Sequence, residues 1–301
     1  MNYDTTEPRT TSGPRPVLGI AGAGRVGSAL ARLLTQRGWE VAGVWSGHTS
    51  TAQRLADQIG SRAWDDAARL RDADLVLLTV PDQTIAGVAA QIAAAGGWRV
   101  NQGVVHCSGA VELSALAPAH DAGACVGGFH PLQAFATIEA AMAVLPGSFF
   151  ALEGEGELRV WLPALVETLD GTYQWLRPGA RALYHAAAVF ASNYLVTLFD
   201  VATHLMQEAG FEAEAAQEAL LPLTGGTVRN LGTVGLPAAL TGPIRRGDTG
   251  TVARHLEALV RYEPSVAQLY LHLARHTVPL ARQLDPDCAQ QIDDLLERRT
   301  A

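Results

Sequence analysis

The sequence predicts an α/β chain in which a doubly wound, mostly parallel sheet is followed by an all-helical domain. Up to about residue 176, short apolar runs alternate with amphipathic segments, which is the pattern of strands joined by crossover helices. Beyond about residue 178, apolar residues recur at helical spacing and no strand-like alternation interrupts them. We therefore expect a polar, disordered leader over residues 1–15, a sheet domain over 16–178 and a helical domain over 179–301.

The strands of the first domain are predicted from short apolar runs that are closed by turn signals. These runs cover residues 17–21, 39–45, 75–80, 104–107, 124–129, 148–152 and 172–176. One helix is expected between the glycine turn after the first strand and Gly38. Others are expected after Pro81 and over residues 157–169. Ligands of such sheets bind at the carboxyl ends of the strands, so Val80, Pro81, Ser108 and Gly109 are expected on one ligand-binding rim.

The helices of the second domain are predicted from continuous apolar periodicity. They cover residues 182–209, 213–221, 249–262, 265–284 and 288–299. The most apolar stretch, residues 186–202, contains Asn193 and Asp200 and follows His185. We therefore expect a buried helix there rather than a membrane span.

The turn after the first strand has the sequence G-x-G-x-x-G, with a strand before it and a helix after it. Its residues are Gly22, Ala23, Gly24, Arg25, Val26 and Gly27. The first glycine allows a sharp turn, the second admits a pyrophosphate close to the backbone, and the third lets helix and strand pack. The helix then directs its unpaired N–H groups toward the phosphates. This context predicts a dinucleotide site of the Rossmann type.

The end of the second strand predicts which dinucleotide binds. An NAD site has a carboxylate there for the ribose 2′-hydroxyl, but the nearest acids in this chain are Glu40 and Asp57. The residues present instead are Ser46, Gly47, His48, Thr49 and Ser50. Hydroxyls and an imidazole, with Arg25 or Arg54, suit a 2′-phosphate, so we predict NADP. The alternative is an ordinary polar loop.

Composition limits the function classes. A chain of 301 residues, 48% of them hydrophobic, can bury one large core or two ordinary ones. The net charge of −8 argues against a general nucleic-acid or membrane-surface binder. Three cysteines without a C-x-x-C pair suggest neither disulfides nor zinc. All 22 basic residues are arginine, so a Schiff-base lysine or a lysine acid is excluded. We expect a cytoplasmic protein that acts on a small molecule.

Several strings of residues resemble one family along nearly the whole chain after the leader. They are Thr79-Val80-Pro81-Asp82, residues 106–110 (HCSGA), residues 129–135 (FHPLQAF), Tyr184-His185 with Asn193, and residues 240–248 (LTGPIRRGD). The chain resembles the family that pairs a Rossmann-like domain with a domain of unknown function numbered 2520. That family lies within the 6-phosphogluconate dehydrogenase-like superfamily. Other members are hydroxyacid dehydrogenases, ketopantoate reductases, pyrroline-5-carboxylate reductases and deazaflavin-dependent NADP reductases.

The resemblance implies carbonyl reduction, but one residue of the usual machinery is missing. Many relatives use a lysine and an asparagine one turn apart on the long helix between the domains. Asn193 matches the asparagine, and Val189 stands where the lysine would be. We expect His185, one turn earlier, to give or take the proton, because an imidazole titrates near neutrality. On a continuous helix His185 and Asn193 lie about 12 Å apart along the axis and roughly 80° around it, so they are not expected to hold the same oxygen.

Each of these residues also has a structural alternative. His130 is the competing acid, since it follows a strand end on the ligand-binding rim and Pro131 restricts it to extended conformations. The alternatives are a core histidine for His185, a structural loop histidine for His130, and an Asn193 that satisfies a buried backbone group.

The string from residue 240 to 248 predicts a turn followed by a helix. Within it Thr241, Arg245 and Asp248 are the candidate substrate-binding residues, with Arg245 placed to clamp a carboxylate. N-capping is the favoured role of Asp248, because a helix follows it directly. His272 and His276 are four residues apart but lack an H-E-x-x-H glutamate and a third ligand, so we predict no metal site.

Three functions remain open. The first is an NADPH-dependent reductase of a small 2-oxo acid, for which superfamily analogy suggests ketopantoate. The second is reduction of an imine or exchange of hydride with a deazaflavin. The third is a noncatalytic protein that responds to a dinucleotide and binds a partner through its helical domain. The resemblance also implies a homodimer formed through that domain.

Overall fold

In the computed structural model, residues 15–299 are described, and the chain forms two compact units. The first unit ends at Ser192 and the second begins at Asn193. The expected domain boundary at residue 178 stays a prediction. The expected leader lies outside the described residues except for Arg15, whose guanidinium lies over the Trp39 ring.

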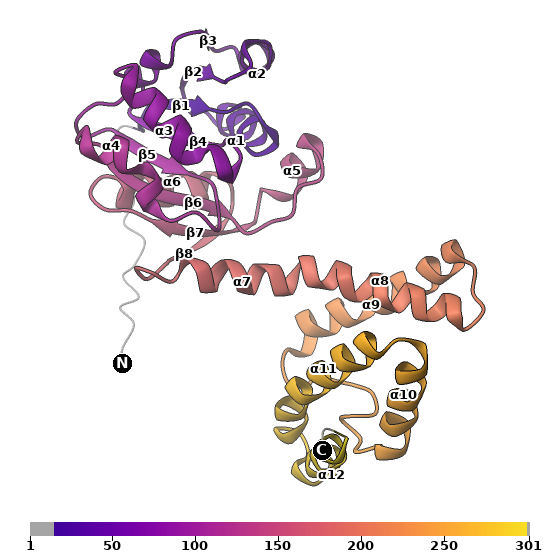
Figure 1. Cartoon of the computed structure of the whole chain (residues 1–301). Coiled ribbons are helices and arrows are strands. Elements are labelled where there is room, and N and C mark those ends of the chain that lie inside the picture. Colours follow the sequence, from indigo (N-terminus) through magenta and orange to yellow (C-terminus); the bar gives the residue numbers. More distant parts are fainter. Residues whose placement is uncertain (1–14, 300–301) are drawn as a thin grey trace. The chain divides into compact units, whose positions relative to one another are not determined.

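An eight-stranded sheet forms the centre of the first unit, and the predicted α/β fold is confirmed (Figure 1). The strands are β1 (Leu18–Ala21), β2 (Val41–Trp45), β3 (Ala63–Trp64), β4 (Leu75–Leu78), β5 (Gly103–His106), β6 (Cys125–Pro131), β7 (Phe149–Glu153) and β8 (Thr172–Trp175). They lie in the order β3-β2-β1-β4-β5-β6-β7-β8, and only β6 and β7 are antiparallel neighbours. The order reverses between β1 and β4, which is where open α/β sheets bind ligands at their carboxyl edge.

Helices cover both faces of this sheet. One core lies under α1 (Arg25–Gln36), α2 (Thr49–Ile59), α5 (Ile138–Val144) and α6 (Leu158–Thr168), and the other under α3 (Ile85–Ala94) and α4 (Ala117–Asp121). Strand β4 serves both cores, because Leu75 and Leu77 point to the first while Val76 and Leu78 point to the second. Short 3₁₀ segments at Ala67–Asp72, Asp82–Thr84 and Leu113–Leu116 complete the connections, and α7 (Arg181–Ala191) ends the unit.

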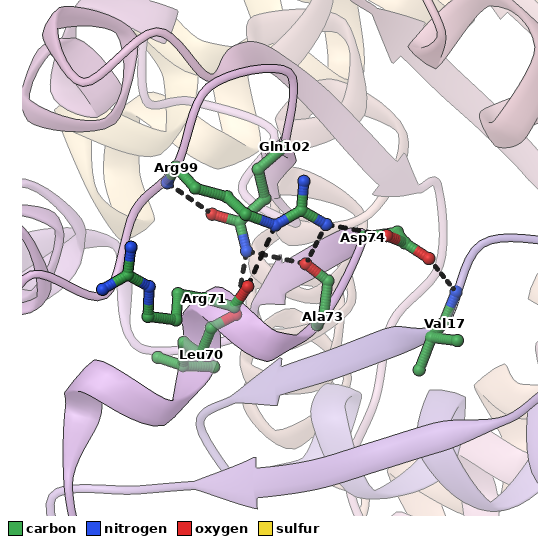
Figure 2. Close-up of polar contacts among 7 residues, drawn as sticks. All are labelled: Val17, Leu70, Arg71, Ala73, Asp74, Arg99 and Gln102. Carbon is green, nitrogen blue, oxygen red and sulfur yellow. Dashed lines mark hydrogen bonds and ion pairs between the residues drawn. The ribbon is translucent and has the colours of Figure 1, made fainter.

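The amino-terminal edge of the sheet is closed by hydrogen bonds, which Figure 2 shows. Gln102 is fully buried before β5, and its amide nitrogen donates to the carbonyl oxygens of Leu70 and Ala73 at 2.8 and 2.9 Å. Arg99 pairs with Asp74 at 2.7 Å, and Asp74 accepts from the backbone N–H that precedes β1. These contacts fix the loops at the amino-terminal edge, which lies opposite the edge that carries the glycine turn.

The described part of the second unit contains helices and no strand, as the sequence predicts. They are α8 (Asn193–Glu208), α9 (Ala213–Val234), α10 (Thr249–Tyr262), α11 (Pro264–Arg282) and α12 (Pro286–Arg298). The last three share an apolar core that includes Val252, Leu271 and Ile292. Helix α9 is longer than predicted, since it continues through Pro222 to Val234 instead of ending near residue 221.

The apolar stretch over residues 186–202 differs from the expectation in two ways. It is interrupted at Ser192, whose φ and ψ of −121° and −70° end α7. It is also not a buried helix, because only 6% of the most apolar window of Arg181–Glu208 is buried. By length and composition this segment could cross a membrane. Its sequence has the apolarity of a core helix, but most of its side chains are not buried.

Candidate functional site

The glycine turn has the geometry that the sequence predicts. Gly22 has a φ of +111°, which a residue with a side chain rarely adopts. A Cβ at Gly27 would lie 2.2 Å from the Gly22 carbonyl oxygen and from the Thr79 hydroxyl, so only glycine allows this packing. A Cβ at Gly24 would have no neighbour closer than 3.8 Å, so its surroundings are open. Gly24 caps α1, whose first N–H groups are therefore available to a phosphate.

The loop after β2 is polar and exposed at the carboxyl end of that strand. The Ser46 and Thr51 hydroxyls lie 3.1 Å apart, and His48 caps α2. Glu40 precedes β2, and Asp57 lies in the third turn of α2. The loop thus offers hydroxyls and an imidazole without a carboxylate, which fits a 2′-phosphate better than a free 2′-hydroxyl.

Arg25, which was expected to contribute to a 2′-phosphate site, contacts backbone carbonyl groups in this structure. Its guanidinium donates to the carbonyl oxygens of Phe135 and Ala136 at 3.0 and 3.2 Å. The side chain therefore holds the segment after β6 beside the start of α1. A role for Arg25 in binding phosphate stays a prediction.

Two further loops follow the carboxyl ends of β4 and β5. Val80 and Pro81 come after β4, where the Thr79 hydroxyl donates to the Gly22 carbonyl oxygen at 2.6 Å and joins this loop to the glycine turn. Ser108 comes after β5, and its hydroxyl accepts from the N–H groups of Ala110 and Val111 at 3.1 and 3.0 Å. The rim predicted from the sequence therefore exists within the first unit.

Two histidines and a tyrosine meet at this rim beside Gly109. A Cβ at Gly109 would lie 2.8 Å from the His130 Nε2 atom and 3.0 Å from the His185 ring. The His130 Nδ1 atom lies 2.7 Å from the Tyr184 hydroxyl, and the two rings pack edge to face. His130 belongs to strand β6 itself, one residue beyond the end predicted for that strand. A side chain at position 109 would require the two imidazoles to move apart.

Burial and a neighbouring arginine set the charge of this cluster. Burial, the Arg181 guanidinium and His185 lower the pKa of His130 to about 4, although Asp82 acts in the opposite direction. Burial raises the pKa of Tyr184 to about 12. At neutral pH His130 is uncharged and Tyr184 keeps its proton. A hydroxyl that donates to Nδ1 leaves the His130 proton on Nε2, toward Gly109.

Beneath the cluster lies a second, more buried layer. His106 ends β5 and is fully buried, and neither ring nitrogen has a partner among the described residues. Burial, Arg181 and His130 lower its pKa to about 3. Burial also raises the pKa of the Cys107 thiol to about 12, so this cysteine is not a nucleophile at neutral pH.

Four of the expected site residues belong to the second unit. Asn193 is the first residue of α8, and its carbonyl oxygen accepts from the Thr197 hydroxyl at 3.4 Å. Asp248 caps α10 by accepting from the Thr251 N–H at 3.0 Å, which confirms the capping role. Thr241 lines a small cavity, and Arg245 is exposed. Their roles toward a substrate stay predictions.

Two residues of the cluster were not predicted. Tyr184 precedes the candidate His185, and Arg181 lies one turn earlier, but the sequence gives no sign that either faces β6. His272 and His276 are exposed, as expected. Among residues 15–299, no group of three or more His, Cys, Asp or Glu side chains could hold a metal ion.

Two family models match the chain. The Rossmann-like domain matches residues 4–131, and the domain of unknown function DUF2520 matches residues 148–277. The resemblance inferred from the sequence is thereby confirmed for both parts. No curated protein sequence matches the chain.

Solved structures with the same fold share low sequence identity with the chain. Protein TM1727 from Thermotoga maritima is 23% identical, with a TM-score of 0.70 over 89% of this chain and 99% of that chain. A reductive aminase from Aspergillus terreus in complex with NADPH and ethyl-5-oxohexanoate is 18% identical, with a TM-score of 0.61 over 93% and 95%. A 1-pyrroline-5-carboxylate reductase from Streptococcus pyogenes is 18% identical, with a TM-score of 0.59 over 94% and 98%.

Proposed function

Because the chain joins an N-terminal Rossmann-like domain to a C-terminal DUF2520 domain, we propose that it is an NADP-dependent oxidoreductase acting on a small carbonyl compound. One observation carries the proposal. The carboxyl edge that presents the glycine turn also gathers His130, Tyr184 and His185 beside Gly109. Proton-transferring groups and an open phosphate cradle on one sheet edge are what hydride transfer to a carbonyl requires.

The residues of the cradle would hold the cofactor by its phosphates. The N–H groups at Gly24 and the start of α1 would bind the pyrophosphate, and Ser46, His48 and Thr49 would bind the 2′-phosphate. When bound, NADPH supplies the hydride that reduces the carbonyl carbon. Val80, Pro81 and Ser108 follow the strands between the glycine turn and the cluster at Gly109 and would contact the bound cofactor.

The proton then comes from His185. Reduction leaves a negative oxygen, and one proton must reach it to complete the alcohol. His130 is uncharged at neutral pH because its pKa is about 4, so it donates a hydrogen bond from Nε2 and holds the oxygen. The imidazole left to give up a proton at this glycine is His185. A 2-oxo acid such as ketopantoate is the proposed substrate class.

Consumption of NADPH with a panel of 2-oxo acids and cyclic imines tests this function. His185→Ala should abolish turnover and change the NADPH dissociation constant by less than about threefold. His272→Ala, at an exposed position on α11, is the matched control and should keep full activity. Tight NADPH binding without turnover on any substrate would support the noncatalytic alternative. Full activity of His185→Ala would remove this histidine from the mechanism.

A cyclic imine is the second candidate substrate. The named structures of similar fold include a pyrroline-5-carboxylate reductase and a reductive aminase, and both names describe chemistry at a C=N bond. Reduction of an imine needs the same hydride at the carbon atom. An imine that is already protonated on nitrogen becomes a neutral amine, so no later proton from His185 is needed. His185→Ala should therefore slow carbonyl reduction far more than imine reduction, and equal loss would contradict this division.

We also propose a cytoplasmic homodimer that forms through the helices of the second unit. Leu221, Leu223, Val228 and Val234 on α9 are 53–67% exposed, and an apolar surface of this kind marks an interface. Leu223→Glu should convert a dimer to a monomer in light scattering. If the apolar helices bind a membrane instead of a second copy of the chain, the protein should sediment together with lipid vesicles.

A further inference from the structure

A fully buried arginine lies directly beneath the proposed catalytic cluster. Arg181 is the first residue of α7 and is 0% exposed, and its guanidinium pairs with Glu153 at the end of β7. An arginine is almost never fully buried unless it is paired. Such a pair adds little stability by itself, because the cost of removing two charges from water offsets their attraction. A contribution to stability therefore does not explain why this ion pair is buried beneath the cluster.

Three contacts fix where the guanidinium lies. Nη2 donates to the Glu153 carboxylate, and Nη1 donates to the Ser108 carbonyl oxygen at 2.5 Å. A Cβ at Gly128 would lie 2.1 Å from Nη2, so the interior of β6 has a glycine where the arginine needs room. The side chain thus joins α7 to the ends of β5 and β7 and passes β6 on the way.

The residues that follow Arg181 on α7 are those of the cluster. Tyr184 and His185 are three and four residues farther along, so they lie on the same helix face one turn on. A contact that fixes the first turn of α7 therefore also fixes their distance from Gly109. The Tyr184 hydroxyl meets His130 of β6, whereas the Arg181 guanidinium reaches the Ser108 carbonyl oxygen just after β5.

We propose that Arg181, held by Glu153, is a positioning residue that keeps Tyr184 and His185 of α7 against the Ser108–Gly109 turn. This inference rests on the proposed function, because the cluster that it positions is the proposed proton-transfer site. Arg181 also acts as a fixed charge. The titratable groups that face His130 are Arg181 and His185, which disfavour its protonation, Asp82, which favours it, and Tyr184 and His106.

A charge-neutral pair of substitutions separates positioning from folding. Arg181→Met alone leaves a buried carboxylate unpaired and is expected to unfold readily, whereas Glu153→Gln with Arg181→Met removes both charges and should remain folded. We expect the double variant to bind NADPH as the wild type does and to lose about 100-fold in kcat, since small misplacements have that effect. Wild-type turnover of the folded double variant would overturn the proposal.

A second readout does not depend on turnover. Histidine NMR should find the pKa of His130 near 4 in the wild type. This pKa should be higher in the double variant because the Arg181 charge is gone, although burial, the larger cause, still lowers it. An unchanged pKa would show that Arg181 does not act on His130. The pKa of His130 can be measured even if the protein reduces no carbonyl. The role of Arg181 can therefore be refuted independently of the proposed function.

Chemical rescue supplies the positive test. Glu153 lines a cavity of about 740 Å³, which is large enough to admit a small carboxylate. Glu153→Ala leaves the buried Arg181 unpaired and should lose stability as well as activity. Millimolar formate should raise its melting temperature and restore at least about a tenth of the lost kcat by pairing with Arg181 in place of Glu153. Glu155→Ala is the matched control, because Glu155 lines the same cavity and has no ion pair with an arginine in the described chain. The role of Glu153 would be contradicted if formate raised kcat equally in the wild type and in Glu153→Ala. It would also be contradicted if no formate concentration raised kcat in Glu153→Ala.

Discussion

Replacing His130 with asparagine is expected to remove a defined part of the pH dependence of stability. Burial, Arg181 and His185 hold the pKa of His130 at about 4 in the folded chain, against 6.5 ordinarily. Between these values the unfolded chain binds a proton that the folded chain does not, so the free energy of unfolding decreases as pH falls through this range. For one group with these pKa values, the loss between about pH 7.5 and about pH 5 is about 2 kcal/mol. Asparagine can still accept from Tyr184 but does not titrate, so the variant should lack this loss.

Urea unfolding followed by tryptophan fluorescence measures the effect in the unit that contains His130. All six tryptophans lie between residues 39 and 175, so the signal reports the first unit and not the second. His272→Asn, at an exposed histidine, is the control and should keep the wild-type dependence on pH. A variant at His130 that loses stability as steeply as the wild type between the two pH values would refute a buried, neutral histidine there.

Three further substitutions test the cradle and the edge opposite to it. Gly27→Ala would place a Cβ 2.2 Å from the Gly22 carbonyl oxygen, so we expect the urea midpoint to fall, with a cost of about 1–3 kcal/mol. Gly24→Ala has open surroundings, so stability should stay unchanged while calorimetry shows NADPH binding weakened by about tenfold or more. Gln102→Leu would remove the two hydrogen bonds that its buried amide donates to the Leu70 and Ala73 carbonyl oxygens, and thermal unfolding should show a loss of about 1–3 kcal/mol.

The fold of the first unit could be predicted because its signals are local. Apolar runs of strand length, closed by turn residues, predicted seven of the eight strands within a few residues, and the exception was the two-residue β3. The glycine motif was informative for the same reason, since Gly22 and Gly27 satisfy constraints that arise within one strand, one turn and one helix. Neither feature depends on residues far away in the sequence.

Features that depend on distant residues were missed or misjudged. Pro222 is a local helix breaker, yet α9 continues through it to Val234 and packs on α8, because tertiary contacts override propensity. The apolarity of residues 186–202 indicated burial, but apolarity does not say whether the covering surface belongs to the same chain. The approach of Tyr184 to His130 spans 54 positions and has no signature in either segment.

The absence of lysine and the position of Arg181 lead to one account of the chemistry. An arginine is never deprotonated in proteins, so in a chain without lysine the basic residues can supply fixed charge but cannot pass a proton. Imidazole and phenol groups can transfer a proton, and the described cluster at Gly109 contains both. Arg181 lies beneath them, paired and fully buried, where it bears on the charge of His130 without competing for the proton. In this proposal the fixed charge and the transferred proton are therefore supplied by two different residues, Arg181 and His185.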